Sequence, residues 1–82
     1  MEISIVVSAE KPKPCFLDDC IRYKVEGNFQ IYRDRYEDLY YTWDFTHGEI
    51  EVFNKRGKHI GVIDAITGET IKPPVRGRKI NL

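Results

Sequence analysis

The sequence predicts an α+β domain that is mainly β, with a strongly twisted antiparallel sheet of about five strands and a short N-terminal helix. Apolar and polar residues alternate over several short segments, as in strands that bury one face. Polar stretches with glycine separate these segments, most clearly Asn-Lys-Arg-Gly-Lys at 54–58. One segment, at 15–22, has helical spacing instead.

The N-terminal part is expected to hold one strand and the helix. Residues 2–7 alternate in hydropathy and predict a strand, which the proline-rich stretch 10–14 ends. Within 15–22, the apolar residues fall on one face of a short helix: Phe16, Leu17, Cys20 and Ile21. A turn follows at 27–28.

The rest of the chain is a series of hairpins. Strands are expected at 28–32, 39–45, 49–54, 59–64 and 70–72. The stretch 33–38 is either a charged connection or a helical turn, and the basic tail at 75–82 is expected to add an edge strand. No internal repeat or linker divides the chain, so 1–82 is taken as one domain.

The hairpin of residues 39–54 contains the candidate residues for proton transfer. Strand periodicity places Trp43, Phe45, Ile50 and Val52 in a core. Asp44 and Glu51 then share the opposite face, with His47 at the turn between them. An acid, a base and an anion on one surface can move protons, although charged residues on a strand are more often only solvated.

Composition excludes some classes of protein. The 82 residues are 41% hydrophobic and 12% aromatic, which excludes a disordered chain. No apolar run could cross a bilayer, so no membrane partner is expected. The first residues do not resemble a signal peptide, which predicts cytosolic synthesis and leaves specialised export or excision from a longer protein open.

Charge and cysteine content add two expectations. Residues 1–53 hold six basic and eleven acidic residues, whereas 54–82 hold seven basic and two acidic, so a neutral chain has a basic C-terminal part. This asymmetry fits an anionic partner or mutual neutralisation of the two halves. Cys15 and Cys20 are expected to be free thiols, and with His47 and His59 they match no zinc-ligand spacing, so no metal or cofactor is expected.

The segment Tyr41-Thr42-Trp43-Asp44-Phe45-Thr46-His47-Gly48-Glu49-Ile50-Glu51, followed by Asp64-Ala65-Ile66-Thr67-Gly68 and then Arg78 and Leu82, resembles the cytotoxic ribonuclease domain of the ribosome-cleaving colicins and cloacin. The resemblance covers about residues 41–82, and residues 1–40 show none. It implies metal-independent cleavage of one phosphodiester bond in the decoding centre of small-subunit ribosomal RNA, which stops translation. It also implies a cognate acidic immunity or antitoxin protein and a cytoplasmic site of action, reached by secretion or delivery into target cells.

The resemblance places four residues at catalytic positions, which are Asp44, His47, Glu51 and Arg78. Glu51 would take the 2′-hydroxyl proton, His47 would protonate the leaving 5′-oxygen, and Arg78 would stabilise the phosphate. Asp44 would orient His47 or hold it charged. Lys72 falls on a further phosphate-binding position of the family, and the other expected RNA contacts are Lys55, Arg56, Lys58, Arg76 and Lys79.

Two departures from the family pattern weaken the match. A family tyrosine is Phe53 here, which removes a hydroxyl from the site, and the dense basic run before the motif is replaced by the mixed-charge stretch 32–38. Two alternatives therefore stay open. One is a non-enzymatic RNA-binding module that stacks bases on Tyr40, Tyr41 and Phe53. The other is a protein-interaction module, such as an inactive toxin relative or an inhibitor.

Overall fold

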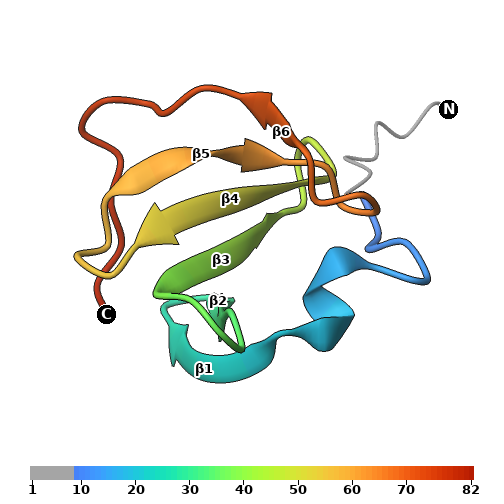
Figure 1. Ribbon diagram of the computed structural model, residues 1–82, viewed down its shortest axis with the longest axis horizontal. Helices are drawn as coiled ribbons and strands as arrows, with labels where there is room; N and C mark the ends of the chain where they lie inside the picture. Colours follow the sequence, from blue (N-terminus) through green and yellow to red (C-terminus); the bar gives the residue numbers. More distant parts are fainter. Residues whose placement is uncertain (1–8) are drawn as a thin grey trace, which may run out of the picture.

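The computed structural model describes residues 9–82, and its centre is one six-stranded antiparallel sheet in which every strand lies beside its neighbour in sequence (Figure 1). The strands are β1 (Ile21–Glu26), β2 (Phe29–Arg33), β3 (Leu39–Asp44), β4 (Glu49–Asn54), β5 (His59–Ile63) and β6 (Thr70–Lys72). The predicted class is right in its main feature, but there are six strands rather than about five. The strand expected at 2–7 lies outside the described residues.

The predicted helix at 15–22 is wrong. Only a 3₁₀ turn, Phe16–Asp19, forms, and it is the single helical element of residues 9–82. The carboxylate of Asp18 accepts the backbone N–H of Cys15 at 2.8 Å and fixes this turn. The chain becomes extended at Cys20 and enters β1 at Ile21, because pairing with β2 satisfies the backbone there.

β1 was not predicted, although Ile21, Tyr23 and Val25 alternate with polar residues along it. It lies at the edge of the sheet, and these apolar side chains stay largely exposed there. The tail, by contrast, was expected to add an edge strand and does not. It forms one isolated bridge, between Lys58 and Lys79.

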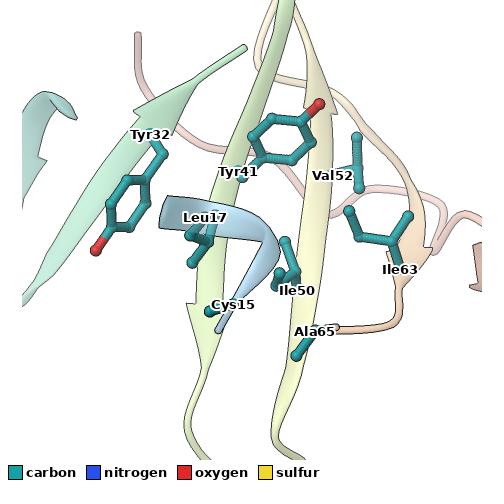
Figure 2. Close-up of a cluster of buried hydrophobic side chains, with 8 residues drawn as sticks. All are labelled: Cys15, Leu17, Tyr32, Tyr41, Ile50, Val52, Ile63 and Ala65. Carbon is teal, nitrogen blue, oxygen red and sulfur yellow. The ribbon is translucent and has the colours of Figure 1, made fainter. Parts of the chain in front are cut away.

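Two apolar clusters cover the two faces of the sheet. On one face the 3₁₀ turn lies across β3 and β4, and its Leu17 contacts residues of several strands (Figure 2). This larger cluster consists of Cys15, Leu17, Tyr32, Tyr41, Ile50, Val52, Ile63 and Ala65. On the other face Ile31, Tyr40 and Phe53 pack under Ile80 and Leu82 of the tail. The tail therefore acts as the second layer, and in Figure 1 it descends past the β4–β5 turn.

The expected core of the central hairpin is right for Ile50 and Val52, which are 0% and 6% exposed. Trp43 is partly buried against the same cluster. Phe45 is 57% exposed, which contradicts the expectation that it fills the core. β3 ends at Asp44, so the strand periodicity that would have turned Phe45 inward no longer applies.

Both cysteines are free thiols, as expected. Cys15 packs in the larger cluster as a small apolar residue. Burial and the nearby carboxylate of Asp34 raise the pKa of Cys20 to about 11, so its thiol stays protonated at neutral pH.

Candidate active site

The carboxylates of the central hairpin lie on the face that the tail covers. In the β3–β4 register Asp44 stands opposite Glu49, and Thr42 stands opposite Glu51. Because side chains alternate along a strand, these residues share the face of Phe53, away from Ile50 and Val52. Glu51 lies two residues from Glu49, about 7 Å along the strand. The predicted placement of Asp44 and Glu51 on one face is confirmed.

Asp44 organises the turn that carries His47. Its Oδ1 accepts the backbone N–H groups of Thr46 and His47 at 2.9 and 3.1 Å, and its Oδ2 lies 2.8 Å from His47 Nδ1. Burial favours a raised pKa for Asp44, but the bonds from the His47 ring and from the two backbone N–H groups outweigh it and lower the pKa. The carboxylate therefore stays charged and directs Nε2 of the exposed His47 ring away from itself.

Glu51 is the most enclosed carboxylate of this face. It is 9% exposed, and its Oε1 lies beside two cationic or potentially cationic groups. Arg78 Nη1 donates a hydrogen bond to it, and His59 Nε2 lies 3.3 Å away. A buried carboxylate held against a fixed guanidinium is a defined position for accepting a proton or for meeting a phosphate.

His59 was not predicted as a site residue, and the structure places it at the centre. It is 1% exposed, and its Nδ1 accepts the backbone N–H of Val75 at 2.9 Å. The neutral ring therefore carries its proton on Nε2, the atom that faces Glu51. Nε2 makes no hydrogen bond of good geometry among residues 9–82, so its contact with Glu51 is a close polar approach and not a formed bond.

The protonation state of His59 follows from its surroundings. Burial is the strongest influence and lowers the pKa of His59. Glu51 opposes that shift, and the charge of Arg78 adds to it. The net effect is a lowered pKa, so the ring is neutral at neutral pH and the pair with Glu51 is not an ion pair.

A bulge in β5 turns His59 onto this face. Glu51 pairs with Val62 and Val52 with Gly61, but Phe53 pairs with His59, so Ile60 is one extra residue in β5. Strict alternation from Val62 would have pointed His59 to the opposite face. The histidine instead meets Phe53, with ring centroids 5.3 Å apart. The only signal in the sequence was a histidine next to Ile60 and Gly61 in a strand, and a bulge cannot be placed from that alone.

Arg78 comes from the tail and reaches the sheet because the tail is bound to β5. The backbone N–H of His59 donates to the carbonyl of Arg78 at 3.0 Å, and the backbone N–H of Ile80 donates to the carbonyl of Gly57 at 2.9 Å. The Arg78 side chain is 46% exposed, so one side of the guanidinium remains open to a ligand while the other holds Glu51. The structure thus joins Glu51 with Arg78, which are two of the four residues that the resemblance assigned to catalytic positions.

Lys72 also reaches this face, through an ion pair of 2.7 Å with Glu49. Carboxylate and imidazole atoms of Asp44, His47 and Glu49 lie within 4.8 Å of one another, which is a spacing that could hold a metal ion. Two of these groups are already engaged within the protein, Asp44 with the His47 ring and Glu49 with Lys72.

The remaining cations predicted to contact RNA are all exposed. Lys55 and Arg56 lie in the β4–β5 turn and Lys58 follows it, whereas Arg76 and Lys79 lie in the tail. The aromatic residues proposed for base stacking are placed differently. Tyr40, Tyr41 and Phe53 are buried, at 9%, 3% and 2% exposure, so none presents a free face for a base. Phe53 is a core residue beside His59, and the missing tyrosine hydroxyl would have stood at that buried position.

Fold and site together define a class: a small antiparallel sheet that presents an Asp–His pair and a Glu–Arg pair on one face beneath a basic tail. Such a combination suits acid–base chemistry on an anionic substrate. The family model described as Cytotoxic matches residues 23–81, and the chain belongs to this family of cytotoxic domains. Membership indicates a toxin domain of nuclease type, consistent with the colicin and cloacin resemblance.

The match also corrects one boundary. It begins at residue 23, in β1, so the resemblance extends well into the part that was judged to show none. No curated protein matches the chain. Among residues 9–82 there is no helix long and apolar enough to span a membrane.

Proposed function

We propose that this protein is a toxin endoribonuclease that cleaves small-subunit ribosomal RNA at the decoding centre, without a metal ion, and thereby blocks translation. The main support is the position of Glu51, which is 9% exposed and faces both Arg78 and the buried ring of His59. A surface carboxylate that was only solvated would have neither partner. RNA brings its own nucleophile, the 2′-hydroxyl, so the protein needs only a base, an acid and a group that stabilises charge.

Glu51 is the base in this proposal. The 2′-hydroxyl loses its proton to Glu51 while its oxygen attacks the adjacent phosphorus atom. In the free protein Arg78 holds Glu51, so an arriving phosphate competes for the guanidinium and releases the carboxylate toward the hydroxyl. His59 then supplies a neutral N–H on the buried side of Glu51, which limits movement of the carboxylate.

His47 is the acid. In the charged ring Nδ1–H donates a hydrogen bond to Asp44, and Nε2 carries the proton that passes to the leaving 5′-oxygen. The 61% exposed side chain of His47 leaves Nε2 open to an RNA strand lying across the face. The products are a 2′,3′-cyclic phosphate and a free 5′-hydroxyl, which balances the proton taken by Glu51 against the one given by His47.

The partners follow from this chemistry. The substrate is ribosomal RNA in the small subunit, met in the cytoplasm of a target cell after secretion or delivery. Exposed cations of the turn and tail supply contacts to phosphates that do not depend on sequence, so target choice comes from RNA shape. A nuclease of this kind would harm the cell that makes it, so we propose a cognate acidic inhibitor that covers the basic tail.

The test is to add the purified protein to intact ribosomes at controlled magnesium and to map RNA ends by primer extension. Glu51→Gln and His47→Ala are run in parallel, with Lys13→Ala as a matched surface control. We expect one new end near the 3′ terminus of the small-subunit RNA, reduced at least about 100-fold in both site variants and unchanged in the control. Ribosomal RNA left intact by folded protein would refute the substrate, and cleavage by Glu51→Gln at the wild-type rate would refute the base.

A further inference from the structure

A hollow of about 290 Å³ lies between the β4–β5 turn and the tail, and its lining is almost wholly cationic. Its lining residues are Arg56, Lys58, Gly77, Arg78 and Lys79. Arg78 therefore has two neighbours of opposite character, because Glu51 lies on the side of the sheet and the hollow lies on the side of the turn.

Two of the cations that line the hollow, Lys58 and Lys79, lie close enough to repel each other. Lys58 and Lys79 form the single bridge of the tail, flanked by the bonds from His59 to Arg78 and from Ile80 to Gly57. They are thus a directly opposed pair between two hydrogen-bonded positions, where side chains lie closest. Like charges placed so are destabilising. Neither lysine, nor Arg56, has an ion-pair partner within residues 9–82.

The backbone around the hollow is fixed by local bonds. Asn54 Oδ1 accepts the backbone N–H groups of Arg56 and Lys58 at 2.9 and 3.0 Å, which holds the turn. Gly57 adopts φ +79°, and a Cβ there would come within 2.1 Å of the carbonyl oxygen of Ile80. Turn and tail can meet this closely only because residue 57 has no side chain. The cations are therefore held together before any ligand arrives.

We propose that this hollow is a second phosphate site, which binds the phosphodiester next to the scissile one on the same RNA strand. A compact anion removes the repulsion between Lys58 and Lys79, and Arg78 links the two phosphates because it faces both the hollow and Glu51. The inference rests on the proposed function only in taking the phosphate beside Glu51 as the scissile one. Two adjacent sites fix the register of the strand over His47 and Glu51.

The test uses adenosine 3′,5′-bisphosphate and adenosine 3′-monophosphate, with dissociation constants measured by calorimetry. Neither contains a phosphodiester bond, so binding is read without cleavage. We expect the wild type to bind the bisphosphate at least about tenfold more tightly than the monophosphate. Lys58→Gln/Lys79→Gln should reduce this ratio to about twofold or less, because only the Arg78 site remains.

Lys55→Gln is the matched control, since Lys55 lies in the same turn and outside the lining of the hollow. It should weaken binding of both ligands slightly and keep their ratio. A ratio that survives in the double variant, with its folded NMR spectrum retained, overturns the inference. So does a hexaglutamate peptide that binds the hollow more tightly than the bisphosphate, which would assign it to an acidic protein. Uncut ribosomes refute the proposed function and leave the bisphosphate ratio unaffected, so the two failures are distinguishable.

Discussion

Replacing His59 with alanine removes one of the groups that join the tail to the sheet, and the loss of stability can be estimated from its contacts. Val75 loses the acceptor of its backbone N–H, which costs about 1–3 kcal/mol in a partly buried place. The ring is 1% exposed and packs on Phe53, so its removal adds a cavity term of about 2 kcal/mol. Together these give about 3–5 kcal/mol, a large part of the stability of a domain this small.

Two further variants distinguish the contributions of the two ring nitrogen atoms of His59 to stability. Asparagine places an oxygen near the position of Nδ1, so His59→Asn should keep the bond from Val75 and cost only about 1–2 kcal/mol. Glutamine places a polar atom near the position of Nε2, so His59→Gln should lose the Val75 bond and keep a contact with Glu51. Urea unfolding measures the stability, and exchange of the Val75 amide proton measures the tail bond directly.

The reasoning would be refuted if His59→Ala unfolded at the wild-type urea midpoint. It would equally be refuted if the Val75 amide exchanged as fast in His59→Asn as in His59→Ala. The backbone bond from Ile80 to the carbonyl of Gly57 does not involve the side chain of residue 59, so protection of the Ile80 amide serves as the internal control.

Three further predictions concern pH, orientation and the tail. The unfolded chain binds a proton at His59 near pH 6.5 and the folded one at lower pH, so stability should fall as pH drops below about 6.5, and His59→Asn should flatten the urea midpoints there. Asp44→Asn keeps the turn acceptor but loses the charge beside His47, so kcat on ribosomes should drop about 100-fold with a free energy of unfolding changed by less than about 1 kcal/mol. Gly57→Ala should break the contact with Ile80 and raise KM for ribosomes more than it lowers kcat, and an unchanged KM would contradict the role of this close approach of turn and tail.

The hairpin chemistry could be predicted from the sequence because it depends on period two. Alternation alone places Asp44 and Glu51 on one face, and an aspartate followed by a glycine-containing turn is enough to bring His47 beside it. Only the resemblance assigned Arg78, 27 residues from Glu51, to the same site, and it did not give their hydrogen bond. No local rule connects a strand residue to a tail that makes a single bridge.

His59 and β1 could not be predicted for different reasons. His59 reaches the site through one extra residue in β5, and a one-residue shift reverses the face of every residue beyond it. β1 was missed because Ile21 was assigned to the helix at 15–22, which hid its alternation with Tyr23 and Val25. The prediction of a helix at 15–22 was wrong because the same apolar spacing arises from a four-residue turn followed by a strand.

The order of the strands has a consequence for how the site is assembled in time. Every strand pairs with its neighbour in sequence, so the sheet can grow from one local hairpin to the next. The tail is the exception, since it must return to residues 57–59 after the hairpins exist. A chain that ends after Lys72 contains Asp44, His47 and Glu51 but lacks Arg78 and three of the five residues that line the cationic hollow. The proposed phosphate sites therefore form last, and a peptide of residues 73–82 supplied in trans is the piece that would complete them.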